Sequence, residues 1–246
     1  MNNIFDLKNK KVLITGGSSG IGNALIQAFE EHGALVTNFD IKKSKKTKGV
    51  NFIKCDLESA DSIDIALREY CNKYKCPDVI INCAAVTISG HAEKYNFMSW
   101  QKTIDINITA IFYVCKFFGN IMIKNKIKGS IINYTSIGAE RGFSNNPAYT
   151  ASKAAVKNLT KSLSVEWGKY GIRVNNIVPG YTATPMNSKS WNSKKLRDVR
   201  SKHTSLGRWA KPKEMVGPTI FLASNASSYV TGADIVVDGG WLSKGM

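Results

Sequence analysis

The strongest constraint on the fold is a regular alternation between short apolar, β-branched runs and segments with helical periodicity. In the segment 23–33 the apolar residues recur at helical spacing, and Gly33 is a natural C-terminal stop. Strands that alternate with helices pair in parallel through right-handed crossovers. The pattern predicts an α/β fold: one doubly wound parallel sheet between two helical layers. The runs expected to be strands buried on both faces are 11–15, 34–40, 51–56, 78–85, 129–136, 172–180 and 234–240.

One stretch departs from this alternation. Residues 183–211 are polar and rich in Lys and Ser, and they include Trp191 and Trp209. We expect this stretch to leave the sheet as a mobile excursion on the substrate side. The length of 246 residues otherwise suits one domain over 1–246, without a linker.

Composition argues against several other classes of protein. No uninterrupted run reaches the eighteen or so apolar residues of a membrane-spanning helix, and the start, MNNIFDLKNKK, lacks the apolar stretch of a signal peptide. We therefore expect a cytoplasmic protein with no membrane partner. The cysteines form neither a CxxC pair nor a cluster with histidines, which predicts reduced thiols and no metal site. They are Cys55, Cys71, Cys76, Cys83 and Cys115.

The formal net charge of +16 is the most unusual feature of the composition. Such a charge can attract nucleic acid or an acidic partner. Here the basic residues are mostly Lys, are spread along the chain, and are not accompanied by a nucleic-acid-reading motif. We interpret the charge as a compositional bias and expect no nucleic acid partner.

A glycine-rich turn, TGGSSGIG, joins the first predicted strand to an amphipathic helix. Gly16, Gly20 and Gly22 let the backbone approach a pyrophosphate, whose charge then faces the free N–H groups and positive dipole end of that helix. The spacing is G-x-x-x-G-x-G and differs from the general G-x-G-x-x-G fingerprint, but the position after the first strand is the same. The turn therefore predicts a dinucleotide site on a Rossmann fold.

Asp40 ends the second predicted strand, about twenty residues beyond the glycines, where a carboxylate can accept hydrogen bonds from the adenosine ribose. A 2′-phosphate would meet like charge there, so Asp40 favours NAD over NADP. The following lysine run, at 42, 43, 45, 46 and 48, leaves NADP open because it could neutralise Asp40 and hold a phosphate; the alternative is a solvated loop. Asp56 is placed to bind the adenine amine or to cap a helix.

Tyr149 and Lys153 lie four residues apart at the start of a predicted helix, so both project from one face. The pKa of an unperturbed tyrosine is about 10. A neighbouring ammonium favours the phenolate, so we expect Lys153 to lower the pKa of Tyr149 towards a useful range for acid–base catalysis.

Over essentially its full length the sequence resembles the short-chain dehydrogenase/reductase family. The resemblance rests on TGGSSGIG, on NCAA (82–85) for the family's N-N-A-G, and on YTASK (149–153). It also rests on Asn107, Ser136, PGYTATPM (179–186) and GADIVVDGG near the end of the chain. The departures are Cys83 and Ala85 in NCAA, which we expect to alter only local packing, and Thr182, where the family often has an aliphatic residue.

The resemblance implies an NAD(P)-dependent oxidoreductase that moves a hydride between nicotinamide and a carbonyl or secondary alcohol. Tyr149 would then exchange the substrate proton, Ser136 would orient the substrate oxygen, Lys153 would also bind the nicotinamide ribose, and Asn107 would hold a relay water. The residues implied to bind the cofactor are Gly16, Ser18, Ser19, Gly20, Ile21, Gly22, Asp40, Asp56, Leu57, Asn82, Ala84, Tyr149, Lys153, Pro179, Gly180, Thr182 and Thr184.

On the substrate side we expect His91, Arg141, Tyr181, Met186 and Trp191. Arg141 lies between Ser136 and Tyr149, where its guanidinium could clamp a carboxylate or phosphate or simply brace the loop. The favoured substrate is a sugar, sugar acid or polyol. A 3-oxoacyl-[acyl-carrier-protein] reductase and, in another class, a non-catalytic dinucleotide sensor are the alternatives.

The family resemblance also implies a homotetramer. Apolar residues on the predicted helix 100–122 exceed what one sheet-facing stripe requires, which is consistent with an oligomer interface or with a helix buried inside the subunit. These residues are Ile104, Ile108, Ile111, Phe112, Val114 and Phe117.

Overall fold

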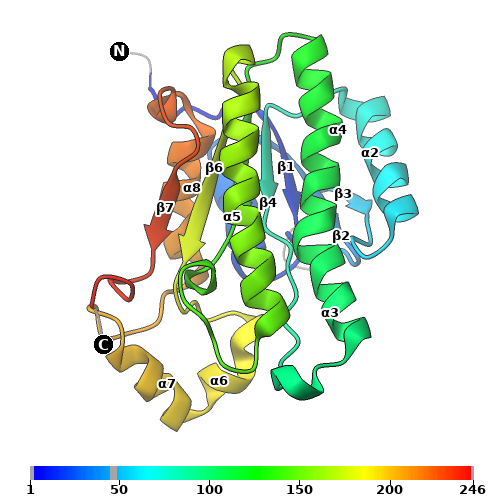
Figure 1. Cartoon of the computed structure of the whole chain (residues 1–246). Helices are drawn as coiled ribbons and strands as arrows, with labels where there is room; N and C mark the ends of the chain where they lie inside the picture. Colours follow the sequence, from blue (N-terminus) through cyan, green and yellow to red (C-terminus); the bar gives the residue numbers. More distant parts are fainter. Residues whose placement is uncertain (1–2, 45–48, 245–246) are drawn as a thin grey trace.

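The apolar runs pair in parallel to form one seven-stranded sheet, with the strand order β3-β2-β1-β4-β5-β6-β7 (Figure 1). The structure, a computed structural model, describes residues 3–44 and 49–244. The reversal of strand order between β1 and β4 is the mark of a doubly wound sheet. The strands are β1 (Lys11–Thr15), β2 (Leu35–Asp40), β3 (Asn51–Lys54), β4 (Val79–Asn82), β5 (Ser130–Tyr134), β6 (Arg173–Pro179) and β7 (Asp234–Val237).

Helices cover both faces of the sheet, with α2, α4 and α5 on one face and α1 and α8 on the other (Figure 1). The α-helices are α1 (Gly20–Glu31), α2 (Ala60–Tyr74), α3 (Phe97–Ile104), α4 (Ala110–Lys124), α5 (Pro147–Trp167), α6 (Ser188–Asn192), α7 (Lys194–Lys202) and α8 (Val216–Ala223). Short 3₁₀ segments are η1 (Ala92–Lys94), η3 (Ile137–Ala139), η4 (Gly168–Tyr170), η5 (Pro185–Asn187), η6 (Pro212–Met215) and η7 (Asn225–Ser227), and η2 (Asp105–Thr109) is a π-helical turn.

The predicted α/β fold class is confirmed, and the sequence pattern located every strand. Several strands end earlier than expected; the run 78–85, for example, pairs only over Val79–Asn82. The apolar residues at the end of such a run continue past the sheet at its carboxyl edge and line a pocket there. They are apolar because they line the pocket, so hydrophobicity alone predicted strands that were too long.

The excursion 183–211 contains α6 and α7, which lie beyond the carboxyl ends of the strands (Figure 1). Trp209 anchors it, because this residue is only 4% exposed and its ring centre lies 5.5 Å from that of Trp191. The sequence pattern did not predict these helices.

The segments α3, η2 and α4 form one continuous helix, Phe97–Lys124, whose most apolar 18-residue window has a mean hydropathy of 1.6. By length and composition this helix could cross a membrane, a property that the sequence analysis missed because polar residues interrupt its apolar runs. Its buried residues, among them Ile111, Val114 and Phe118, belong to the core between the sheet and α2 and α5. It is therefore a core helix of this domain.

A row of polar side chains crosses strands β4 to β7; its three asparagines are buried and its aspartate is half-buried. Asn82, Asn133, Asn176 and Asp234 occupy paired positions on successive strands. The Asn82 amide donates to Asn133 Oδ1 at 2.8 Å, and the Asn176 amide donates to Asp234 Oδ1 at 2.7 Å. The Thr160 hydroxyl of α5 joins the two halves, because it accepts from the Asn133 amide at 2.8 Å and donates to Asn176 Oδ1 at 2.7 Å. Buried polar groups are costly unless paired, so this row requires one register and one position of α5.

Removing the central amide of this row should destabilise the fold. Asn133→Ala leaves the Asn82 amide and the Thr160 hydroxyl short of a partner in a site with no solvent access, which we expect to lower the free energy of unfolding by about 2–4 kcal/mol. Urea unfolding followed by circular dichroism measures this value. Asn158→Ala, at an exposed position on α5, is the control and should change it by less than about 0.5 kcal/mol. A similar, small effect of both variants would contradict the role of the row.

Candidate active site

A pocket of about 1150 Å³ opens at the carboxyl edge of the sheet. Its position is the one at which open α/β sheets bind ligands, next to the reversal of strand order between β1 and β4. The segments that follow six of the strands line it. They contribute Gly16 and Ser19–Gly22 after β1, Asp40 and Ile41 at the end of β2, Cys55–Glu58 after β3, Cys83–Thr87 after β4, Tyr134–Ile137 after β5 and Pro179–Thr182 after β6.

The glycine-rich turn is packed too closely for side chains. A Cβ on Gly16 would lie 2.7 Å from the Ala84 Cα, and one on Gly22 would lie 2.3 Å from the Gly16 carbonyl oxygen. Gly16 also has φ +72°, which favours glycine. The side chain of Ser19, the N-cap of α1, makes no capping hydrogen bond. The backbone N–H groups at the N-terminus of α1 are thus free to bind an anion at the pocket wall. The close-packed glycine turn lets a dinucleotide pyrophosphate approach them.

Asp40 is held at the edge of this pocket by backbone donors. Its Oδ2 accepts from the Ser18 N–H at 3.0 Å, and its Oδ1 accepts from the Lys42 N–H at 3.5 Å. Ser18 does not line the pocket; it orients Asp40, and its hydroxyl accepts from the Asn38 amide at 3.0 Å. Lys42 and Lys43 are exposed, while positions 45, 46 and 48 of the lysine run lie outside the described residues.

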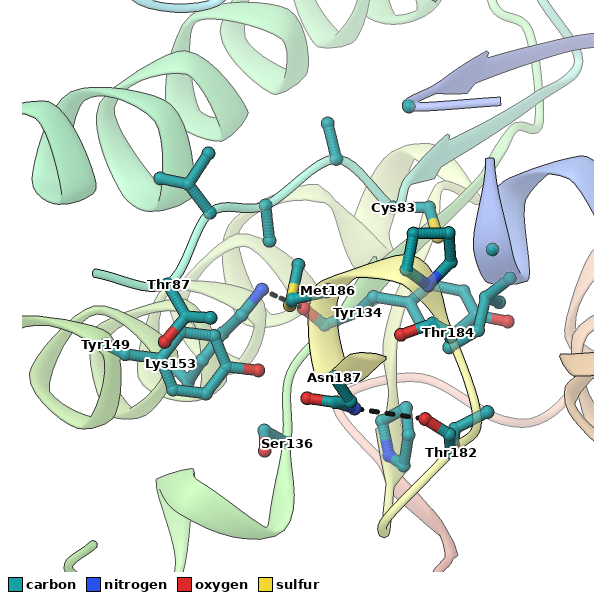
Figure 2. Close-up of a pocket in the computed structure, with 18 of the residues that line it drawn as sticks. Cys83, Thr87, Tyr134, Ser136, Tyr149, Lys153, Thr182, Thr184, Met186 and Asn187 are labelled. Atoms are coloured by element: carbon teal, nitrogen blue, oxygen red, sulfur yellow. Dashed lines mark hydrogen bonds between the residues drawn. The ribbon is translucent and has the colours of Figure 1, made fainter. Parts of the chain in front are cut away.

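Tyr149, Ser136 and Lys153 come together in the pocket (Figure 2). Tyr149 and Lys153 project from the first turns of α5, and Ser136 follows β5, where its Oγ accepts from the Gly138 N–H at 3.0 Å. The Ser136 side chain lies next to that of Tyr149 in the pocket. The Lys153 ammonium donates to the Tyr134 carbonyl at 2.8 Å and lies 5.8 Å from the centre of the Tyr149 ring.

The electrostatics of these groups differ from the sequence expectation. Burial raises the pKa of Tyr149, and the neighbouring Ser136 hydroxyl opposes that rise. The expected lowering by Lys153 is wrong for this structure, because the ammonium contacts the Tyr134 carbonyl and the face of the ring. Burial lowers the pKa of Lys153 itself to about 8. Tyr149 is therefore a neutral phenol near pH 7, suited to giving a proton to a substrate oxygen.

Asn107 and Asn82 lie behind the pocket wall. Asn107, in the π-helical turn η2, accepts from the Val86 N–H at 2.8 Å and donates to the Val86 carbonyl at 2.9 Å. Its amide also donates to the Ser152 hydroxyl at 3.1 Å, one residue from Lys153. Asn82 belongs to the polar row that crosses the sheet. Both fully buried amides therefore position the wall formed by residues 83–87.

The two departures from the N-N-A-G pattern both line the pocket. Cys83 lies near the Lys153 ammonium, and burial raises the pKa of its thiol to about 12, so the thiol stays protonated. The expectation that Cys83 and Ala85 alter only local packing is therefore too narrow, because both shape the pocket wall itself.

The remaining cofactor candidates lie on the wall: Ile21, Asp56, Leu57, Ala84, Pro179, Gly180, Thr182 and Thr184. Figure 2 shows Thr182 and Thr184 across the pocket from Tyr149. The Thr182 carbonyl accepts from the Asn187 amide at 3.0 Å, which fixes the strand-to-helix turn in that segment.

The structure separates the expected substrate residues into two groups. Tyr181 and Met186 line the pocket, whereas His91, Arg141 and Trp191 do not. Arg141 is exposed because the chain turns outward after η3, and the following residues Gly142 and Phe143 face the pocket instead. His91 is exposed at the start of η1, and Trp191 packs on Trp209.

Sequence reasoning missed several wall residues, of which Phe143 and Arg200 are the most informative. The periodicity of the sequence does not predict where a side chain points in an irregular loop or on a short polar helix. The sequence therefore could not place Phe143 or Arg200 in the pocket. Other wall residues that it missed include Thr87, Lys102, Ser144, Asn146, Asn187, Ser188, Lys189 and Ser190.

This arrangement can exchange a hydride and a proton with one substrate. A nicotinamide dinucleotide, when bound along the glycine turn and Asp40, supplies or accepts the hydride. In this arrangement the Tyr149 hydroxyl can exchange a proton with a substrate oxygen, and the Ser136 hydroxyl can hold that oxygen in place. The fold and the site define a dinucleotide-dependent oxidoreductase.

Comparisons with known proteins agree with this class. A family model described as enoyl-(acyl carrier protein) reductase matches residues 16–242. A 2-dehydro-3-deoxy-D-gluconate 5-dehydrogenase of Dickeya dadantii is 33% identical, over 98% of this chain and 99% of its own length. A 3-oxoacyl-[acyl-carrier-protein] reductase of Chlamydia muridarum is 36% identical, over 95% of this chain and 98% of its own length.

A solved structure supports the same class of oxidoreductase. A crystal structure of a gluconate 5-dehydrogenase from Burkholderia cenocepacia, in complex with NADP and tartrate, superposes with a TM-score of 0.92 at 29% identity, over 98% of each chain. The chain belongs to the short-chain dehydrogenase/reductase family. It is an NAD(P)-dependent oxidoreductase of a carbonyl or secondary alcohol group.

The buried Lys153 gives the stability of the protein a defined pH dependence. Its pKa in the fold is about 8, below the 10.5 of a free lysine, so between these values the unfolded chain binds more protons than the folded chain. The free energy of unfolding should therefore rise with pH across this window, by up to about 3 kcal/mol from this group.

Urea unfolding of the wild type and of Lys153→Met, at pH 7 and at pH 10, measures this contribution. We expect the variant to gain stability relative to the wild type at pH 7, and that gain to shrink by pH 10. A difference between the two proteins that does not change with pH would contradict the lowered pKa of Lys153.

Proposed function

We propose that this protein is an NAD-dependent dehydrogenase that interconverts a secondary alcohol and a carbonyl on a sugar, sugar acid or polyol. The observation that carries the proposal is the convergence of Ser136, Tyr149 and Lys153 in one pocket with the glycine turn. The similar proteins named above that act on 2-dehydro-3-deoxy-D-gluconate and gluconate support this substrate class.

Tyr149 is the proton donor or acceptor, and Ser136 orients the reacting oxygen through its hydroxyl. Lys153 binds the nicotinamide ribose with its ammonium. Asn107 lies behind the pocket wall, where its side chain holds the backbone of Val86 and the hydroxyl of Ser152. Its proposed role in the reaction is to hold a water that continues the proton relay from Lys153.

NAD is the proposed cofactor because of the Asp40 carboxylate. The carboxylate faces the pocket, and two backbone N–H groups hold it in place. It can therefore accept hydrogen bonds from the hydroxyls of the adenosine ribose. A 2′-phosphate at hydrogen-bond distance would be opposed by about 4 kcal/mol at an effective dielectric of 20. The crystal structure of the Burkholderia cenocepacia enzyme holds NADP, so a similar protein accommodates the 2′-phosphate.

An acyl-carrier-protein reductase is the second candidate function. The Chlamydia muridarum relative and the net charge of +16, which suits an acidic carrier protein, favour it. Asp40 opposes the NADP that such a reductase usually prefers. A dinucleotide sensor without catalysis, the third possibility, would have no need of the Tyr149 and Lys153 pair.

Turnover with a panel of substrates separates these functions. We expect sugar acids, polyols or aldoses to change the nicotinamide absorbance, with a lower KM for NAD than for NADP. Tyr149→Phe should reduce kcat by at least about 100-fold and leave dinucleotide binding intact, because only the proton-exchanging hydroxyl is lost.

The matched control is Tyr229→Phe, at a fully exposed position, which should not change kcat. Turnover confined to an acetoacetyl thioester would instead favour the carrier-protein reductase. Dinucleotide binding without turnover of any member of the panel would favour the sensor.

We also propose that the protein is a cytoplasmic homotetramer in which α4 and α5 pack against a partner. Of the apolar residues expected on this surface, Phe112 is exposed and Ile104, Ile108 and Phe117 are half-buried, whereas Ile111 and Val114 lie in the core. On α4, Tyr113 adds to the exposed apolar area, and on α5 Val165 is 83% exposed. Apolar surface of this extent on two adjacent helices is typical of an interface.

Light scattering at micromolar concentration measures the assembly. The wild type should have four times the mass of one chain, and Phe112→Glu combined with Tyr113→Glu should dissociate it by placing charges in the interface. Val199→Glu, exposed on α7, is the control. A wild type that scatters as a monomer would contradict the proposed tetramer.

A further inference from the structure

An aromatic cluster lies at the pocket, and two of its members, Phe143 and Tyr181, belong to the pocket wall. The rings of Phe143 and Tyr181 are stacked 6.2 Å apart, and Tyr181 lies 5.1 Å from Trp209. Trp241 closes the cluster, with its ring edge-on to Phe143 at 5.9 Å. Phe143 comes from the loop between Ser136 and Tyr149, so the cluster is continuous with the catalytic residues.

Arg200, on α7, lies over this cluster and lines the pocket. Its guanidinium carbon is 4.9 Å from the centre of the Tyr181 ring and 5.8 Å from that of Trp209. These cation–π contacts hold the planar group in one orientation. Among residues 3–44 and 49–244, no carboxylate forms an ion pair with it and no group accepts its hydrogen bonds.

The acidic side chains of the pocket wall lie at one end of it. Asp40 at the end of β2, and Asp56 and Glu58 after β3, face the part of the pocket proposed for adenosine, where Lys102 also lines the wall and pairs with Glu58. At the other end the charged wall residues are Lys153, Lys189 and Arg200, with no acidic side chain among the described residues there. The end that holds Tyr149 is therefore cationic.

We propose that Arg200 is the specificity-determining residue of this site and that it binds the carboxylate of an anionic substrate, such as a sugar acid. A guanidinium held flat by aromatic rings, with its donors free, suits a bidentate carboxylate. This assignment rests on the proposed function and narrows its substrate class from polyhydroxy compounds in general to those that carry a carboxylate.

Arg200 also replaces Arg141 as the candidate clamp. Arg141 is exposed and does not line the pocket, so it lies off the path of the substrate. Arg197, one turn earlier on α7, is the natural control, because its guanidinium lies 5.3 Å from the Trp191 ring centre and it does not line the pocket.

A matched pair of probes tests the assignment. D-gluconate and D-glucitol differ only in that a hydroxymethyl group replaces the carboxylate. Titration calorimetry in the presence of saturating NADH, which cannot accept a hydride from either alcohol, gives the affinity of each probe without turnover. We expect the wild type to bind gluconate at least tenfold more tightly than glucitol, and Arg200→Gln to lose about 10-fold to 100-fold of its affinity for gluconate with little change for glucitol.

Two further variants control for a structural role. Arg200→Lys keeps the charge but not the planar donor pair, so it should retain part of the preference for gluconate, and Arg197→Gln should retain all of it. Unchanged NAD affinity in each variant verifies the fold and the dinucleotide site.

Three results would overturn the assignment: a wild type that does not prefer gluconate, an Arg200→Gln variant that keeps the preference, or equal losses for both probes, which would mark Arg200 as a brace for α7. Failure of the proposed function is separate, because it would appear as absent turnover in the substrate panel while these binding affinities stay as expected.

Discussion

The position of the active site depends on the hydrogen-bonded row of Asn82, Asn133, Thr160 and Asn176. Apolar side chains alone would let parallel strands slide past one another, since one β-branched residue packs much like the next. Buried amides do not allow this, because each shift of register leaves donors without acceptors. One acceptor of the row is unsatisfied: the side-chain amide oxygen of Asn82, Oδ1, has no hydrogen-bond partner among the described residues.

The residues of the pocket follow this row by one or a few positions. Cys83 comes directly after Asn82, and Tyr134 comes directly after Asn133 and supplies the carbonyl that holds the Lys153 ammonium. Thr160 and Lys153 lie on the same helix, so the hydroxyl that completes the row also sets the depth at which α5 presents Tyr149 and Lys153. The row thus aligns the strand ends with the catalytic helix.

The sequence predicted those parts of the site in which backbone geometry leaves a residue pattern. Gly16 and Gly22 must lack side chains, and Tyr149 and Lys153 must share a helix face, so both features could be read from spacing. Arg141 was expected in the pocket and lies outside it, while Arg200 was missed, because the direction of a side chain on a loop or short helix depends on tertiary packing. The pKa of Tyr149 was misjudged for a similar reason: proximity in sequence did not reveal that the Lys153 ammonium contacts the Tyr134 carbonyl.

The two hydrogen bonds between Asn107 and the backbone of Val86 join the long helix Phe97–Lys124 to the floor of the pocket. Such a pair fixes both translation and tilt, since movement in either direction would break at least one of the bonds. The joint lies in the π-helical turn, where the wider backbone turn brings the amide to the strand end. The helix and the pocket wall formed by residues 83–87 would therefore move together as one rigid unit. A displacement of the outer surface of the helix would be transmitted to that wall.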